Sequence, residues 1–410
     1  MNQTSPSFAG WVSSPSTRGS IDIVFSSFLA IFLCTWSSLC LNVPHPDDSD
    51  FKILLRKVKW MLWGILMPEV VLSISFGQYA SARRSVQRFR ELGYPHWTLR
   101  HGFFADMGSM LLLPEGDVPF VINSSQVAFL VEKGYMECPK ITAEEIWDKS
   151  KADFVSKSFA FLQASWFLFQ LLGRAIVPLP TTALEIFTGA IVFCSFGNFV
   201  CWLHKPNDIR KSITLKIDVS LQQVVSGGEE AAAVFHRHTD NMDEKPSKYA
   251  TMAKAFGLSL GGRGRGRPLV RIPNSTFPEL TVSHKVAFFC LGKVYAAFHL
   301  AAWNAHFPTN FELRGWRIAI LIFPPDENTW SKYLKLLPRQ KLSTQQAFRK
   351  EDDGESAVSQ AHKNCRRVQR ENFGLCFHPV YRVVIRATLV PLYVISRLFL
   401  VVGALSSLRS

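Results

Sequence analysis

Long apolar runs limit the possible folds of this chain more strongly than any other feature of its sequence. A helix rises about 1.5 Å per residue, so roughly 20 apolar residues cross the hydrocarbon core of a bilayer, which is about 30 Å thick. Within that core only helices and closed barrels satisfy all their backbone hydrogen bonds. Six runs approach this length, at residues 21–41, 58–76, 154–177, 184–203, 285–306 and 383–405. We therefore predict an all-α fold, a polytopic transmembrane helix bundle with about six spans, five or seven being the alternatives.

Composition supports a multi-pass membrane location. Hydrophobic residues make up 48% of the 410 residues and charged residues only 19%. A soluble chain of this length would form two or three domains, because domains usually contain about 100 to 200 residues. Apolar runs this long cannot all be buried in such small soluble cores, so the expected solvent is lipid. The sequence does not indicate which cellular membrane holds the protein.

Several runs carry features that shape the expected helices. The first is longer than a signal-peptide core of about 7 to 15 residues, so we expect it to remain in the protein. Pro68 lies inside the second run and predicts a kink, because proline removes one backbone hydrogen bond. Pro178 and Pro180 separate the third run from the fourth, which predicts an antiparallel hairpin.

The order of the runs predicts soluble loops that alternate with membrane segments. The loops lack internal repeats and long periodic segments, so we expect them to be largely irregular or disordered. A short apolar stretch at residues 316–323 stops at a Pro-Pro pair, after about half the length of a span, and is expected to be interfacial or re-entrant. The predicted segments are an N-terminal tail (1–20), two transmembrane helices (21–76), a soluble loop (77–153), a transmembrane hairpin (154–203), a basic, partly disordered loop (204–283), a transmembrane helix (284–306), a soluble loop with the interfacial stretch (307–382) and a C-terminal transmembrane helix (383–410).

Positive charge is concentrated between the apolar runs. The formal net charge is +14, and basic segments beside membrane helices attract anionic lipid headgroups. We therefore expect the lipid bilayer and its anionic headgroups to be the partners. The GGRGRGRP string at residues 261–268 contains a core like that of minor-groove DNA-binding peptides. A flexible basic linker explains it better, so a nucleic-acid partner is not predicted.

Two signals compete over the orientation of the chain. Basic residues are dense at the membrane ends of the first two soluble loops, which favours a cytoplasmic location for both loops. Basic residues in the connection before residue 60 oppose this, as do acceptor sequons at Asn2, Asn123 and Asn274. We give more weight to the basic residues of the two loops, which place both loops in the cytoplasm. Asn123 and Asn274 are therefore expected to carry no glycan.

Ionisable and amide side chains inside the apolar runs are the candidates for an intramembrane polar site. A charge in the bilayer costs about 2.5 to 3.5 kcal/mol on insertion scales, so such residues are usually paired or functional. Glu69 follows the kink-forming Pro68, while Gln163, Gln170 and Arg174 fall within about 40° on one helix face. These three side chains form a polar stripe. Hydrogen bonds that hold neighbouring helices together explain this stripe as well as a substrate path does. The complete set of candidates is Glu69, Gln163, Gln170, Arg174, Glu185, Lys293 and His299.

No pattern in the chain specifies a reaction. The His101–Asp106 segment could support acid and base chemistry, but an interfacial anchor and a capped helix start explain it equally well. Phosphate-binding loops, nucleophile elbows and zinc-protease motifs do not occur in the sequence. The eight cysteines form no CxxC pair and no Cys/His cluster with zinc spacing. No cofactor or metal is therefore predicted, and whether the chain is an enzyme stays open.

Several long strings in the chain are familiar together. They are LNVP (41–44), RKVKWMLWGILMPE (56–69), WTLRHGFFADMG (97–108), EIWDKSKAD (145–153), W-x-H-K-P-x-D (202–208) and FHLAAWNAHFPTNFELRGWR (298–317). In this order they resemble a large group of fungal integral membrane proteins with no established reaction, ligand or catalytic residue. The chain departs from that pattern at Cys40, where the family usually has His, and at its end, where the family pattern continues. The resemblance implies a membrane protein and no activity.

Three classes of function follow as hypotheses. The polar candidates favour a carrier or channel for a small or apolar molecule. The alternatives are a membrane-embedded enzyme acting on a lipid or prenyl-type substrate and a non-catalytic scaffold or receptor. A carrier often shows inverted repeats and broken helices at mid-membrane, and here Pro68 is one break with no clear counterpart. An enzyme should gather acids and bases near one interface, whereas the acids and bases of this chain are scattered. The small-molecule ligand, if the chain has one, is not identified by the sequence.

Overall fold

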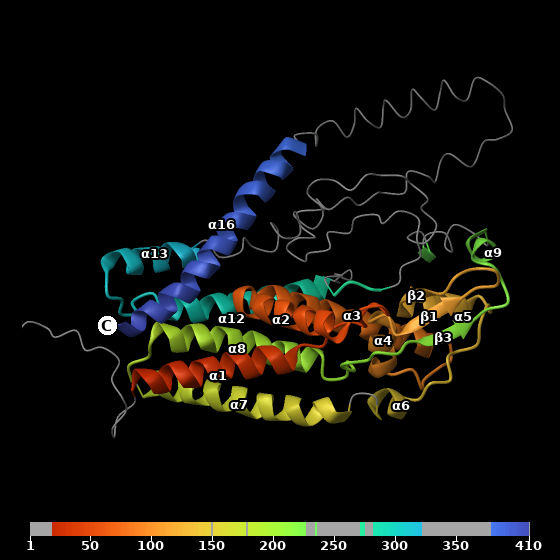
Figure 1. Ribbon diagram of the computed structural model, residues 1–410, viewed down its shortest axis with the longest axis horizontal. Coiled ribbons are helices and arrows are strands. Elements are labelled where there is room, and N and C mark those ends of the chain that lie inside the picture. Colours follow the sequence, from red (N-terminus) through yellow and green to blue (C-terminus); the bar gives the residue numbers. More distant parts are fainter. Residues whose placement is uncertain are drawn as a thin grey trace, which may run out of the picture. The chain divides into compact units, whose positions relative to one another are not determined.

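The computed structural model describes residues 19–148, 151–177, 179–226, 234–235, 271–274, 282–321 and 379–409. The chain divides into two compact units, of which the first contains residues 1–308 and 404–410 and the second residues 309–403. Helices dominate both units (Figure 1). The basic string at residues 261–268 and most of the loops expected to be disordered lie outside the described residues.

Three helices of the first unit form the bundle that the apolar runs predict: α1 (Ser20–Ser38), α7 (Lys151–Ile176) and α8 (Ala183–Cys201). The ring of Phe161, early in α7, lies 4.7 Å from that of Phe196, late in α8. Leu171, later in α7, lies against Gly189, earlier in α8, so the two helices are antiparallel. That this hairpin crosses a membrane stays a prediction. Val192 of α8, Cys34 of α1 and Ala164 of α7 belong to one cluster of buried apolar residues.

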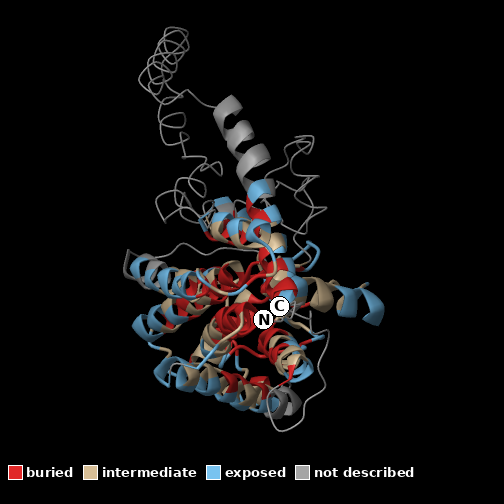
Figure 2. Cartoon of the chain, turned by 90° about the vertical axis from the view of Figure 1, so that its left-hand side faces the viewer, coloured by how far each residue is buried: buried red, intermediate tan, exposed pale blue. Residues whose placement is uncertain are grey.

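Burial differs sharply among these helices. The apolar window of α8 is 72% buried, whereas those of α1 and α7 are only 22% and 17% buried. The central helix thus packs against protein, while its neighbours expose large apolar side chains such as Phe25 and Phe159. Figure 2 shows this division, with buried residues in the centre and exposed residues on the outer faces. Such outer faces fit a lipid environment.

The number of spans predicted from the sequence, six, is not confirmed. Among the described residues three helices, α1, α7 and α8, are long and apolar enough to cross a membrane, or four if the bent pair α2 and α3 counts as one span. The fifth and sixth apolar runs do form helices, α12 (Val282–Ala301) and α16 (Pro379–Ser406). Lys293 interrupts the apolar character of α12, and the described apolar part of α16 is short, at Leu392–Ser406.

The second apolar run breaks instead of kinking. It forms α2 (Asp50–Leu66) and α3 (Pro68–Glu91), which meet at Met67 with a bend of 112°. Pro68 explains the break, because proline disfavours helical backbone in the preceding residue and is well suited to the first position of a helix. Residues 58–76 therefore belong to two helices that run in different directions, and the prediction of one kinked helix was wrong.

The loop predicted at residues 77–153 is folded, which corrects the expectation of an irregular segment. We call this folded part the head; it comprises the end of α3, α4 (Leu99–Asp106), β1 (Met110–Leu113), β2 (Phe120–Ile122), α5 (Ser124–Glu132), α6 (Ala143–Asp148), β3 (Ile213–Lys216) and α9 (Leu221–Ser226). The strands form one sheet in the order β2-β1-β3, in which β1 is antiparallel to β2 and parallel to β3.

The head has its own hydrophobic core. Phe89, Phe104, Met110 and Phe120 are among its fully buried members, and the ring of Phe89 stacks on Trp97 at 3.8 Å. Burial of each large apolar side chain contributes about 1.5 to 3 kcal/mol, so a core of this kind can hold short elements together. The short strands were missed in the sequence because none of them has enough residues for a periodic pattern.

In the second unit α13 (Asn310–Leu321) packs against α16, where Gly315 lies against the ring of Phe399. α13 has 12 residues, which agrees with the short helix length expected for an interfacial or re-entrant segment. That location stays a prediction.

Candidate functional site

A buried lysine lies just beyond the end of α8. The helix ends at Cys201, and the turn that follows brings Lys205 inward, with its backbone N–H donating to Trp202 O at 3.0 Å. Its ammonium donates to Cys40 O at 2.7 Å, to Asn42 Oδ1 at 2.8 Å and to Gln78 Oε1 at 2.8 Å. An ammonium has three N–H donors, so all of them have partners.

Trp202 completes this arrangement, which we call the Lys205 cluster (Cys40, Asn42, Gln78, Trp202 and Lys205). Its indole N–H donates to Gln78 Oε1 at 3.0 Å. The indole ring lies 5.1 Å from the Lys205 ammonium, a distance at which the ring face attracts a cation. The cluster therefore ties together the segment after α1, the middle of α3 and the segment after α8.

Burial controls the electrostatics of the cluster. It lowers the pKa of Lys205 to about 7, since the charged form loses its hydration, and nearby Lys157 lowers the pKa further. Cys40 and Asp106 act in the opposite direction. The oxygens that contact the ammonium are all neutral, so no carboxylate hydrogen-bonds to it. Lys205 can therefore change its charge near neutral pH.

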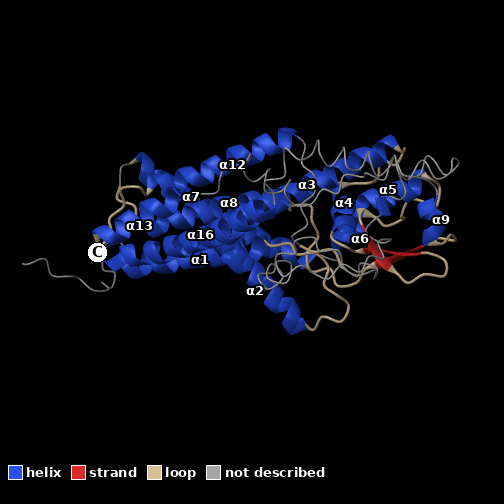
Figure 3. Cartoon of the chain, turned by 90° about the horizontal axis from the view of Figure 1, so that it is seen from above, coloured by secondary structure: helices blue, strands red, loops and turns tan. Residues whose placement is uncertain are grey.

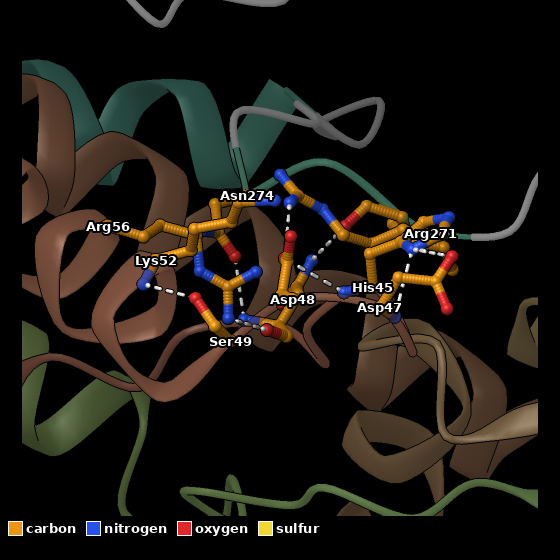
Figure 4. A network of polar contacts seen from close by, with 10 residues as sticks. His45, Asp47, Asp48, Ser49, Lys52, Arg56, Arg271 and Asn274 are labelled. Carbon is orange, nitrogen blue, oxygen red and sulfur yellow. Dashed lines mark hydrogen bonds and ion pairs between the residues drawn. The ribbon is translucent and has the colours of Figure 1, made fainter.

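A second set of contacts extends from Asn42 toward the start of α2. The backbone N–H of Asn42 donates to Asn274 Oδ1 at 2.6 Å, and Arg56 donates to Asn42 O at 3.2 Å. Arg271 Nη1 lies 3.8 Å from Asp48 Oδ2. Figure 4 shows Arg56, Asp48, Arg271 and Asn274 side by side between α2 and the segment at residues 271–274. The LNVP string thus holds a distant segment of the chain against the bundle.

The structure brings only some of the predicted polar candidates together. Arg174 Nε lies 3.9 Å from Glu185 Oε1, and Arg174 also donates to Pro180 O at 3.1 Å. Glu185 is buried and accepts hydrogen bonds from the backbone and the hydroxyl of Thr182, which caps α8. This pair lies at the hairpin end of the bundle, opposite the Lys205 cluster.

The remaining candidates are scattered. Glu69 is buried in the first turn of α3, and His299 is buried against the ring of Phe187, with Nδ1 3.1 Å from Tyr295 O. Lys293 is exposed. On α7, Gln170 is exposed and Gln163 only partly buried, because the inward face is occupied by Ala160, Ala164 and Phe167. The predicted stripe therefore does not line the interior of the bundle.

His101 and Asp106 have structural roles in the head. His101 Nε2 lies 2.9 Å from Ile141 O, and Nδ1 lies 2.9 Å from Thr98 Oγ1. Asp106 Oδ1 accepts from the backbone N–H of Ser124 at the start of α5, and burial raises the pKa of this carboxyl. These contacts hold α4 against its neighbours in the head, so both side chains have a structural role.

The head also carries an open cleft of about 530 Å³. Ile141 and Ile213 supply its apolar part, and Lys140, Glu145 and Asp148 supply charged groups. Among the described residues no group of three metal-ligating side chains is close enough to hold a metal ion.

Neither Lys205 nor Gln78 was singled out in the sequence. Their partners come from three distant segments, so spacing alone could not reveal the cluster. One signal was available, because Lys205 and Asn42 lie in two of the strings that carry the family resemblance, W-x-H-K-P-x-D and LNVP.

Comparison with known proteins places the chain in a family but gives it no activity. No curated protein and no solved structure matches it. A family model described as a family of unknown function (DUF8562) matches residues 2–229, more than half of the chain and all five residues of the Lys205 cluster. The chain therefore belongs to the DUF8562 family, a family of unknown function.

Proposed function

We propose that the chain is an integral membrane protein of the scaffold or receptor class, in which the helix bundle holds the head at one membrane surface. One observation carries this proposal. α3 is a single helix whose middle packs in the bundle, where Ser75 donates to Asn198 Oδ1 at 2.7 Å, and whose last turns supply Phe89 to the core of the head. Membrane helices and head are thus joined without a linker.

The polar side chains inside the bundle support the same class. Ser75 bonds to Asn198 of α8, and Gln78 bonds to Trp202 and Lys205. Hydrogen bonds between helices of this kind hold membrane bundles together. A carrier would use such groups to bind its cargo, and its site would gather the polar candidates in one place. The scattering of those candidates favours the scaffold or receptor.

A carrier is the second candidate, and the break at Met67 is the observation that favours it. Transporters often place a substrate at the end of a discontinuous helix, and buried Glu69 lies in the first turn of α3. The two functions differ in where they would bind a ligand. A receptor would use the open cleft of the head, where charged side chains border Ile141 and Ile213, whereas a carrier would use the surroundings of Glu69.

Two experiments test the proposal. Extraction of membranes with carbonate at high pH should leave the protein in the pellet, and release into the soluble fraction would contradict membrane integration. Purified protein is then screened for thermal stabilisation by sterols, prenyl diphosphates and small metabolites, with Glu145→Gln and Glu69→Gln as paired variants.

The paired variants separate the classes. A stabilising compound whose effect is lost in Glu145→Gln and kept in Glu69→Gln supports binding by the head. The opposite result favours the carrier, and chemical conversion of a compound by the protein would show an enzyme. Either of these two results would overturn the scaffold or receptor proposal.

A further inference from the structure

One face of α2 is apolar, and most of its side chains are exposed among the residues that the structure describes. At about 100° per residue, six apolar residues of α2 occupy an arc of roughly 100° along the whole helix. They are Phe51, Leu54, Leu55, Val58, Leu62 and Ile65. Phe51 is 72% exposed and Leu55 56% exposed, so this face does not contribute to a protein core.

The opposite side of α2 holds the helix against the bundle. Trp60 and Trp63 pack on the cluster that contains Leu39 and Trp202. Gly64 approaches Thr35, since a Cβ at this glycine would lie 3.7 Å from the Thr35 side chain. The orientation of α2 is therefore fixed by protein contacts, and the apolar face is turned away from them.

Basic side chains lie beside the apolar face. In projection, Lys52 and Lys59 lie within about 60° of one edge of the arc and Lys57 within about 60° of the other. Asp50, the acidic residue of the helix, is 2.7 Å from Arg210 in an ion pair. The helix therefore presents an apolar strip between positive borders, the pattern of helices that lie in an anionic membrane interface.

The position of α2 matches a membrane boundary. Its contacts with α1 fall at Thr35 and Trp36, in the last turn of that candidate span, where Lys57 lies 4.7 Å over the Trp36 ring. The bend of 112° from α3 directs α2 across the bundle, and Figure 3 shows it projecting sideways. If α1 crosses the membrane, a helix that runs across its last turn lies at the depth where lipid headgroups meet acyl chains.

We propose that α2 is an in-plane interfacial helix that inserts its apolar face into the lipid surface and contacts anionic headgroups through Lys52, Lys57 and Lys59. Lipid fits this face better than a second copy of the chain does, since three like charges border it and two such faces would repel each other. The inference requires that α1, α7 and α8 cross a membrane, but it does not depend on the receptor role.

Photo-crosslinking in the full-length protein tests the contact. Benzoylphenylalanine replaces Leu55 in one variant, and the protein is placed in nanodiscs of phosphatidylcholine with or without phosphatidylserine. Val118 of the head, 61% exposed, is the matched control, and Phe159 of α7, 72% exposed, reports on the span. Adducts are identified by mass spectrometry of the intact protein.

We expect lipid adducts at positions 55 and 159 and none at position 118. A covalent dimer at position 55, or no adduct there while position 159 reacts, would overturn the inference. Failure at position 159 as well would overturn it by contradicting the membrane placement of α7, which the proposed function also requires.

The charges are tested in the same variant. Lys52→Gln, Lys57→Gln and Lys59→Gln together should lower the preference for phosphatidylserine adducts at position 55 by at least about fivefold, the factor that corresponds to about 1 kcal/mol for one lysine near an anionic surface. An unchanged preference would show that the lysines do not contact anionic headgroups.

Discussion

Opposing demands act on the side chain of Lys205. The three oxygens that accept from Nζ at 2.7 to 2.8 Å match an ammonium, because a neutral amine has only two N–H donors and a lone pair. Burial disfavours the same ammonium. With a pKa of about 7, the charged and neutral forms of Lys205 are similar in free energy close to physiological pH.

The first prediction concerns the pH dependence of stability. The pKa of Lys205 is about 7 in the folded protein and has an ordinary value of 10.5, so between these values the unfolded chain binds more protons. The free energy of unfolding should therefore rise with pH in this window, by about 2 kcal/mol between pH 7 and pH 9 at 1.36 kcal/mol per pKa unit. Below pH 7 the contribution should be constant. Thermal unfolding in detergent measures the effect.

The control for this prediction is Lys205→Met, which removes the titrating group and leaves the other groups in place. The variant should be less stable than the wild type at every pH, because three buried oxygens lose their donors. The difference in melting temperature between the two proteins should increase with pH above 7. A difference that does not change with pH would contradict a titrating Lys205.

The second prediction is that Arg174 and Glu185 are energetically coupled. Glu185 is 3% exposed, and its carboxylate is 3.9 Å from the guanidinium, so removing the guanidinium takes away part of the compensation of a buried charge. Arg174→Ala and Glu185→Gln should each lower the melting temperature. The double variant should lose less than the sum, with a coupling energy of about 0.5 to 3 kcal/mol. Glu185→Gln keeps an acceptor for the cap at Thr182, and strictly additive losses would show no coupling.

The Arg174–Glu185 pair and the Lys205 cluster differ in how far the sequence could predict them. Arg174 and Glu185 flank a short connection between two apolar runs, so their proximity follows from the hairpin. The partners of Lys205 come from residues 40, 42 and 78. Their proximity depends on how α1, α3 and α8 pack, which no local pattern specifies.

At the scale of the element, the break between α2 and α3 shows what a proline can and cannot indicate. Pro68 identifies the place where regular hydrogen bonding must stop, and the sequence therefore predicts a change of direction. Its size, 112°, depends on the packing of Trp60 and Trp63 against Leu39 and Trp202. Those contacts link segments outside the run, so the angle could not be derived from the run itself.

The third prediction compares two helical glycines. A Cβ at Gly102 of α4 would lie 2.5 Å from Ser85 Oγ and 3.0 Å from the backbone of Ala82 in α3, whereas a Cβ at Gly173 of α7 would meet no atom within 4 Å. Gly102→Ala should lower the free energy of unfolding by about 1 to 3 kcal/mol through overpacking. Gly173→Ala should leave it unchanged or raise it by up to about 1 kcal/mol. Melting temperatures of the two variants decide, and equal effects would contradict the close approach of α3 and α4.

For the whole molecule, the fold of the head was the largest gap in the sequence prediction. β1 and β3 have four residues each and pair in parallel, although about 100 residues separate them in the chain. The intervening segment contains the hairpin of α7 and α8. A pattern search along the chain separates these strands by two long apolar helices and cannot show that they belong to one sheet.

The fourth prediction concerns the side of the membrane on which the head lies. We expect the head to face the cytoplasm, so neither Asn123 nor Asn274 should carry a glycan. The two positions differ as reporters: the side chain of Asn274 is buried and accepts from Asn42, whereas Asn123 is partly exposed at the start of α5.

Glycosidase treatment of protein made in eukaryotic cells, followed by gel electrophoresis, measures whether either asparagine carries a glycan. A mobility shift that disappears in Asn123→Gln would show that the head faces the side of the membrane where glycans are added, and would contradict the prediction. Asn274→Gln is the matched variant, because the Asn274 side chain is buried in the folded protein.

The continuity of α3 has a consequence for how its length can vary. Gln78 contacts Lys205, and Phe89 lies in the core of the head. The two are 11 positions apart, about three turns, so nearly the same face of the helix serves both ends. One inserted residue between them would rotate the head by about 100° around the α3 axis, whereas seven would leave an error of only about 20°. The direction in which the head faces is therefore set by a count of residues within one helix, and related chains should differ there by whole turns.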